Sequence, residues 1–147
     1  MKTTLILLFL IFAFLAILIV PRLLKAGAYV IIDSKKFYVD VAKTQQEKEK
    51  GLAIYKSMPK DRGMIFPFNT PDYRYFWMKG MAFPLDIIYI RQGKIVEIFK
   101  SLPPPKSAEE ILPTVTSEEK TDMVLETNAG LSNQYNFKKG DLVKINY

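Results

Sequence analysis

The sequence contains no cysteine and no histidine. Without cysteine the chain has no disulfide bond and no thiol nucleophile. Without histidine it lacks the commonest general base at neutral pH, the imidazole of a catalytic triad and the most frequent zinc ligand. Neither a GxGxxG motif nor a P-loop occurs. We therefore expect no metal and no cofactor, and these absences favour a protein that is not an enzyme without deciding the question.

Acidic residues are missing from the N-terminal segment, which contains an almost unbroken apolar run over residues 5–20. Residues 1–28 are therefore expected to be a membrane anchor or a signal segment, with residues 1–25 in contact with the bilayer. As a single-pass anchor, the segment would place the C-terminal domain outside the cytoplasm. The triplet Ala-Gly-Ala at residues 26–28 allows an alternative, in which cleavage near Ala28 releases the domain as a secreted protein.

Net positive charge is spread along the chain rather than gathered in one patch. The whole chain carries +6, and without the three basic residues of the N-terminal segment the remainder carries +3. This remainder has no compact block of lysine and arginine, so we expect no nucleic-acid partner. The expected partners are the membrane and either an envelope protein or a small polar ligand.

Short segments rich in β-branched and aromatic residues alternate with turns throughout residues 29–147, which we expect to form one domain. The clearest pair of strands is joined by Gln92 and Gly93, a sequence typical of a hairpin turn. A second turn is expected at Asp33 and Ser34. The predicted strands cover residues 29–32, 36–42, 63–68, 73–79, 84–91, 94–100, 122–126 and 142–146.

Helical signals are few. The sequence TQQE at residues 44–47 fits a capping box and predicts a short helix whose charged side chains face solvent, and residues 128–135 predict another. Residues 102–119 are rich in proline and are expected to form a loop. The predicted fold class is mostly β (α+β): a small mixed β-barrel or curled sheet with one or two short helices, preceded by an N-terminal transmembrane or signal helix.

The stretch FWMKGMAFPLDIIYI, residues 76–90, places one lysine and one aspartate in an apolar run. Because buried charges need partners, Lys79 and Asp86 either pair, or Asp86 accepts backbone N–H groups, or both line a pocket. Glu126 ends another apolar segment, and Trp77 offers an aromatic surface for a ligand. We take Trp77, Lys79, Asp86 and Glu126 as candidate ligand-binding residues, and assign no catalytic or metal-binding residue.

Five pieces of this sequence resemble, in their order, the DUF192 family, a domain of unknown function. They are GLAIYKSMPKDRGMIFPF, FWMKGMAFPLDIIYI, the turn at Gly93, VLETNAG and KKGDLV, within residues 46–143. The resemblance implies a small β-rich domain of bacteria and archaea, often behind a signal sequence or membrane anchor, without an established activity. Ala53 and Gly80 depart from the family's pattern, which usually has Met and Asn there. The missing Asn removes an amide that caps a loop or contacts a ligand.

Three functions are compatible with these residues, and the simplest is a purely structural accessory domain whose charges only fix the strand register. The favoured one is a domain tethered to the outer face of the membrane that binds a small ligand or an envelope partner without catalysis. The alternative is a carboxylate-dependent hydrolase or transferase that acts on envelope glycans through Asp86 and Glu126. It requires both carboxyl groups in one cleft, about 5–9.5 Å apart. Carboxyl groups on opposite faces of the sheet would exclude it.

Overall fold

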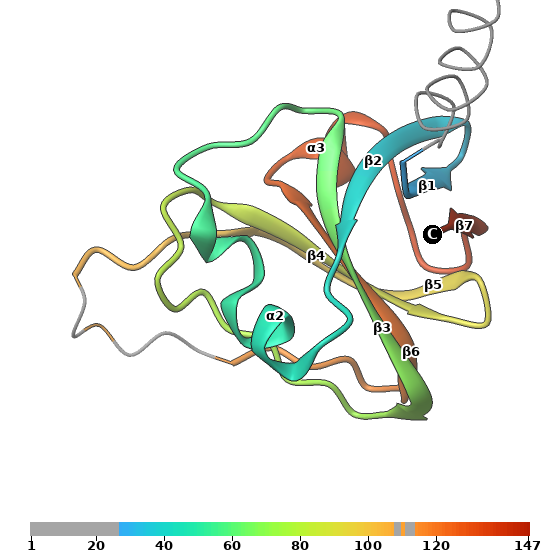
Figure 1. Ribbon diagram of the computed structural model, residues 1–147. Coiled ribbons are helices and arrows are strands. Elements are labelled where there is room, and N and C mark those ends of the chain that lie inside the picture. Colours follow the sequence, from blue (N-terminus) through green and yellow to red (C-terminus); the bar gives the residue numbers. More distant parts are fainter. Residues whose placement is uncertain (1–26, 108–109, 111–113) are drawn as a thin grey trace, which may run out of the picture.

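The domain is built on one seven-stranded sheet that curls strongly (Figure 1). The structure, a computed structural model, describes residues 27–107, 110 and 114–147. The N-terminal membrane or signal helix expected over residues 1–28 therefore lies, apart from its last two residues, outside the described part of the chain. Among the residues that are described, no helix is both long and apolar enough to cross a bilayer.

Strands β4, β6 and β3 form the centre of the sheet, whose order is β5-β4-β6-β3-β2-β1-β7. Neighbouring strands are antiparallel except β2 and β3, which are parallel. The sheet is a curled half-barrel, and a bridge between Lys94 and Leu142, the residue before β7, brings its two edges together at one point. This confirms the expected mostly β class. The elements are β1 (Tyr29–Ile32), β2 (Lys35–Val41), α2 (Gln45–Lys50), the 3₁₀-helix η1 (Gly51–Ile54), β3 (Arg62–Asp72), β4 (Leu85–Arg91), β5 (Lys94–Leu102), β6 (Thr121–Asn128), α3 (Leu131–Gln134) and β7 (Val143–Asn146).

Local sequence signals set the turns and the start of α2. Gln92 and Gly93 both have positive φ, 49° and 70°, as a tight hairpin turn between β4 and β5 requires. At the start of α2, the Thr44 hydroxyl accepts the Glu47 N–H at 3.2 Å, and the Glu47 carboxylate accepts the Thr44 N–H at 2.8 Å. The predicted hairpin and capping box are therefore confirmed.

Residues 73–79 do not form the strand that their alternating pattern predicts. The alternation itself is present, since Phe76 and Met78 turn inward while Tyr75 and Trp77 are exposed. However, the segment packs its side chains against the face of the sheet instead of pairing with a strand along the sheet's edge. Its β pairing is a single bridge between Phe76 and Val115, which also orders part of the proline-rich loop.

Two hydrophobic cores lie on opposite faces of the sheet. The first fills the inside of the curl and includes Phe37, Ile65, Ile88, Leu125 and Phe137. The second lies between the other face of the sheet and a cover made of η1 and the segment after β3, and it includes Leu52, Phe66, Met78, Tyr89 and Val124. The central strands are therefore buried on both faces, as their nearly continuous apolar sequences indicate.

The parallel pairing of β2 and β3 determines where α2 lies. Parallel neighbours need a crossover connection, because the chain must return to the starting end of the sheet. Here α2 and η1 form that connection, and Figure 1 shows α2 on one side of the long β3–β6 pair with β1 and β7 on the other. The crossover leaves α2 facing residues 73–81 across the second core.

Gly63 allows β3 and β6 to lie close together. A Cβ atom at this position would lie 2.6 Å from the backbone oxygen of Glu126, which cannot rotate away. We expect Gly63→Ala to lower the free energy of unfolding by about 2 kcal/mol in urea denaturation, because overpacking forces the backbones apart. Gly27→Ala is the matched control, since a Cβ there meets nothing within 4 Å. Equal stability of the two variants would contradict this reading.

Candidate functional site

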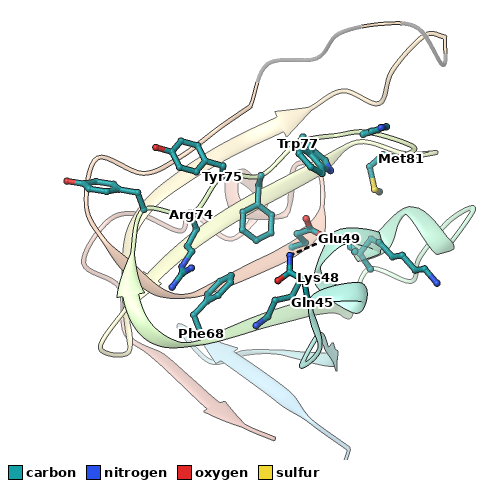
Figure 2. A pocket seen from close by; sticks show the side chains of 15 residues that line it. Gln45, Lys48, Glu49, Phe68, Arg74, Tyr75, Trp77 and Met81 are labelled. Carbon is teal, nitrogen blue, oxygen red and sulfur yellow. Dashed lines mark hydrogen bonds between the residues drawn. The ribbon is translucent and has the colours of Figure 1, made fainter.

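A pocket of about 290 Å³ lies between α2 and the segment of residues 73–81 (Figure 2). Its remaining walls come from η1, from Phe68 on β3 and from Glu126 on β6. Three of the four candidate residues, Trp77, Lys79 and Glu126, line this pocket, and Asp86 does not. The structure thus brings together most of the predicted site, although on the face of the sheet away from Asp86.

Aromatic side chains form the rim of the pocket. Tyr73, Tyr75 and Trp77 are 46%, 69% and 51% exposed, which is unusual for three aromatic residues within five positions. Between them, Phe76 points inward and packs edge-on against Phe66 with ring centroids 5.0 Å apart. The buried ring fixes the segment on the core, and the rim residues are left free to contact a ligand.

Glu126 closes the inner end of the pocket. Its side chain is only 4% exposed, and its Oε2 atom has no hydrogen-bond partner among the described residues. Burial raises the pKa of this carboxyl to about 8, although the backbone amide of Leu52 acts in the opposite direction. At neutral pH the carboxyl is therefore mostly protonated, and it presents both a hydrogen-bond donor and an acceptor.

Lys48 and Arg74 place two positive charges beside Phe68, and this part of the pocket is its cationic wall. The Lys48 ammonium lies 4.5 Å, and the Arg74 guanidinium 4.0 Å, from the centre of the Phe68 ring. Figure 2 shows both side chains directed toward this ring from α2 and from the opposite segment. Both residues are half-buried. Burial, and then the charge of Arg74, lower the pKa of Lys48.

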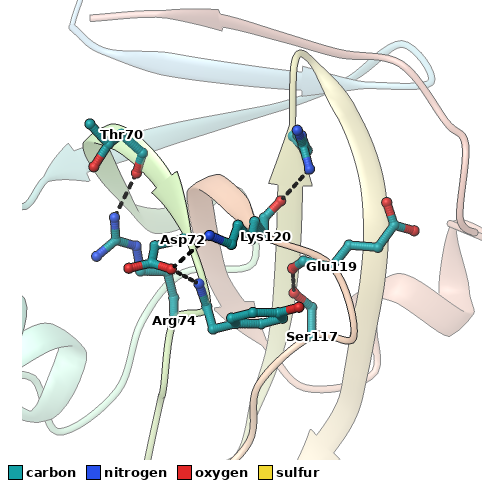
Figure 3. Close-up of polar contacts among 8 residues, drawn as sticks. Thr70, Asp72, Arg74, Ser117, Glu119 and Lys120 are labelled. Carbon is teal, nitrogen blue, oxygen red and sulfur yellow. Dashed lines mark hydrogen bonds and ion pairs between the residues drawn. The ribbon is translucent and has the colours of Figure 1, made fainter.

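Backbone and charge contacts hold the chain just beyond the end of β3, where Arg74 lies (Figure 3). The Arg74 Nη2 donates to the Thr70 carbonyl at 2.6 Å, while its buried Nε–H has no acceptor in the described part of the chain. Nearby, Lys120 and Asp72 form an ion pair at 3.7 Å. Arg74 is therefore held in place by a backbone oxygen and not by a carboxylate.

Asp86 stabilises the fold on the opposite face of the sheet. One carboxylate oxygen accepts the N–H groups of Ser101 and Gly130, at 2.8 and 3.0 Å, and the other accepts the Ser132 N–H at 2.8 Å. Gly130 and Ser132 begin α3, so Asp86 caps this helix from a distant strand. Of the alternatives open from sequence, acceptance of backbone N–H groups is the one observed.

The carboxylate pair required by the glycan hydrolase or transferase does not form. On adjacent strands, Glu126 is paired with Ile87, whereas Asp86 is paired with Thr127. Because paired residues share a face and consecutive residues alternate, Asp86 and Glu126 point to opposite faces of the sheet. The hypothesis that they act as a catalytic pair is therefore wrong.

The possible ion pair between Lys79 and Asp86 is also wrong. Lys79 is exposed at the pocket, while Asp86 is fully buried. The only ion pairs in the described ranges are Lys120 with Asp72 and Lys139 with Glu119. Within those same ranges, no group of three or more acidic side chains is placed to hold a metal ion.

Lys48, Phe68 and Arg74 were not identified from the sequence. The charges of α2 were interpreted as solvent-facing, which is correct for most of them. A usable signal was nevertheless present, because Gln45, Lys48 and Glu49 fall in the spacing i, i+3, i+4 that places residues on one helical face. All three line the pocket. The position of Arg74 opposite this face depends on the crossover, which local patterns do not encode.

Comparisons with known proteins agree on the fold and define no activity. The DUF192 family model, described as "Uncharacterized ACR", matches residues 28–145. No curated protein is significantly similar to the chain. A solved protein of unknown function from Novosphingobium aromaticivorans is 30% identical with a TM-score of 0.71, covering 81% of this chain and 84% of its own. A Sinorhizobium meliloti protein described as "a putative transcription regulator" is 28% identical with a TM-score of 0.70, covering 80% and 91%.

Proposed function

This chain belongs to the uncharacterised DUF192 family, and from that premise we propose that it is a binding module whose pocket holds a small polar ligand with a sugar or aromatic ring. The ring stacks on Trp77 at the rim, and the polar groups of the ligand reach Glu126 at the inner end. Lys79 lies beside the rim and contacts the same ligand. Asp86 has no part in this site, because its carboxylate is occupied by the fold.

The observation that carries the proposal is a carboxyl oxygen of Glu126, at the inner end of the pocket, that has no hydrogen-bond partner among the described residues. A buried polar atom without a hydrogen-bond partner costs about 1–3 kcal/mol. Replacement by an apolar residue of similar size would avoid this cost, so a carboxyl here is better suited to a ligand than to stability. Exposed Trp77 and Tyr75 on the same pocket supply the apolar surface that a ring requires.

Binding without catalysis is favoured by the isolation of Glu126. A glycosidase mechanism requires a second carboxyl group near the reacting atoms. Asp86 lies on the other face, and Glu49, the remaining acidic residue of the pocket, is hydrogen-bonded to Gln45 at 3.0 Å. One protonated carboxyl is well suited to donate and accept hydrogen bonds to a ligand.

The location we propose is the outer face of a membrane, with the domain tethered through residues 1–25. The apolar run over residues 5–20 supports attachment to a membrane, because its length is near that of a bilayer span. Protease added to intact cells should digest the domain. In a separate experiment without protease, the full-length chain should stay in the membrane fraction after alkaline extraction. Protection of the domain from the protease would contradict the proposed orientation.

Trp77 is the only tryptophan of the chain, so its fluorescence reports on the pocket directly. We expect saturable quenching or a spectral shift when the full-length chain is titrated with a panel of sugars, nucleosides and their phosphates. By calorimetry, Trp77→Ala should weaken binding of the best ligand about tenfold, since stacking on one aromatic ring contributes on the order of 1 kcal/mol.

Tyr38→Ala provides the matched control, because this exposed aromatic residue lies on β2, away from the pocket. Its binding constant should equal that of the unchanged protein. If no member of the panel altered Trp77 fluorescence, or if both alanine variants weakened binding equally, the proposed ring-binding site would be refuted.

A further inference from the structure

We infer that the ligand is an anion and that its phosphate group binds beside the Phe68 ring, in contact with both Lys48 and Arg74. This inference rests on the proposed function, since it assigns a chemical class to the ligand of the same pocket. The pocket would then have two parts, an aromatic rim for the ring and a cationic wall for the phosphate.

The first support is that two positively charged side chains lie at the same aromatic ring. Lys48 and Arg74 both lie over the Phe68 ring, and neither has a carboxylate within 4.0 Å in the described part of the chain. Like charges held close together repel, and partial burial strengthens the repulsion because water screens it less. An anion in contact with both side chains removes this repulsion.

The second support is the orientation of Arg74. Its Nη2 is bound to the Thr70 carbonyl, while its Nε–H is buried without an acceptor among the described residues. A guanidinium fixed in this way offers donors in a planar arrangement that matches the oxygens of a phosphate. Lys48 adds a mobile point charge from α2, on the other side of the Phe68 ring.

The charge of the site favours a phosphate over a carboxylate. A phosphate monoester carries about −1.5 to −2 at pH 7, close to the two positive charges of the pair. A carboxylate neutralises only one of them. Glu126 does not oppose the anion, because its carboxyl is mostly neutral at this pH. Lys79 and Lys50 also line the pocket and add to its positive potential.

Inorganic phosphate tests the cationic wall without the ring. Calorimetric titration of the full-length chain in a neutral detergent, at fixed ionic strength, should show saturable binding of phosphate at millimolar concentration. Lys48→Gln with Arg74→Gln should weaken this binding at least tenfold, since a hydrogen bond to a charged group contributes a factor of this size. Lys48→Gln alone should retain the fold even if the Arg74 change does not, and should weaken binding severalfold.

The matched control changes two lysines that contact aromatic rings elsewhere. Lys35 and Lys36 on β2 lie 5.0 and 4.2 Å from the ring centres of Tyr135 and Tyr29. Lys35→Gln with Lys36→Gln removes the same charge and should leave phosphate binding unchanged. Equal weakening in both double variants would overturn the inference, because it would indicate general charge attraction. Absence of phosphate binding to the unchanged protein would overturn it too.

Matched ligands separate this inference from the proposed function. Trp77 fluorescence compares the affinities of three related compounds: a neutral ring compound, its phosphate ester and its carboxylate analogue. One such set is glucose, glucose 6-phosphate and glucuronate, and the comparison is repeated for each ring of the panel. The phosphate ester should bind at least thirtyfold more tightly than the neutral parent. If the neutral compound or the carboxylate binds as tightly as the ester, the phosphate assignment fails while the ring site stands. If no ring compound binds but inorganic phosphate does, the ring site fails and the cationic wall stands.

Discussion

Asp86→Asn is expected to lower the free energy of unfolding by about 3 kcal/mol. The carboxylate accepts three backbone N–H groups in the protein interior, from Ser101, Gly130 and Ser132. An amide retains one oxygen, so one buried N–H meets a second donor, and the remaining hydrogen bonds lose their charge. Urea denaturation followed by circular dichroism measures the change, and hydrogen exchange should show α3 opening more often in the variant.

Asp72→Asn controls for the loss of one acidic group. Asp72 is exposed, accepts the N–H of its neighbour Tyr73 and forms an exposed ion pair with Lys120, so its replacement should change stability by less than about 0.5 kcal/mol. Ligand binding by folded Asp86→Asn should be normal, because Asp86 does not line the pocket. Normal stability combined with lost binding would show that Asp86 belongs to the site after all.

Glu126→Gln is expected to have the opposite effect and to stabilise the protein by about 3 kcal/mol at pH 8. The unfolded chain loses the proton of this glutamate near its ordinary pKa of 4.5, whereas burial raises the pKa to about 8 in the folded protein. Between these values the folded state binds more protons than the unfolded state, so the free energy of unfolding falls as pH rises. Each unit of difference between the folded and unfolded pKa corresponds to about 1.4 kcal/mol of unfolding free energy. Water that enters through the pocket reduces the total effect.

The free energy of unfolding, measured from pH 4 to pH 8, shows whether stability falls as pH rises. The unchanged protein should become less stable over this range, and Glu126→Gln should remove most of that decrease. Glu49→Gln is the control, since Glu49 lines the same pocket but is exposed, and its replacement should leave the slope unchanged. A parallel pH dependence in the unchanged protein and Glu126→Gln would mean that the carboxyl is already ionised and solvated. Loss of ligand binding in Glu126→Gln at unchanged or higher stability would support the site.

Local features of the fold were predictable from sequence, whereas the assembly of the sheet was not. The capping box at Thr44, the turn at Gln92 and most strands are encoded within a few neighbouring residues. By contrast, β6 lies between β4 and β3, and β2 pairs in parallel with β3, so both arrangements depend on contacts far apart in the chain. Residues 73–79 show the limit clearly, because alternation describes which side chains are buried and not whether the backbone pairs.

The candidate site follows the same division. The sequence predicts Trp77, Lys79 and Glu126 as site residues because charged and aromatic side chains stand in or at the end of apolar segments. The structure places all three around one pocket. The sequence could not predict whether Asp86 lies on the same face of the sheet as Glu126. The register of β4 against β6 decides which face each carboxyl occupies. Arg74 is a similar case, since only the crossover places it opposite Lys48.

The meeting of β5 and β7 also bears on self-association. An open sheet offers unpaired backbone groups along its outer strands, and these can recruit another copy of the chain into an aggregate. Here the bridge at Lys94 covers the beginning of β5. Farther along the same strand, Ser101 has a φ of 55° next to exposed Lys100, and the register with β4 shifts there. An irregular backbone and a charged side chain both disfavour a further strand, so the domain is protected against edge-to-edge aggregation along much of β5.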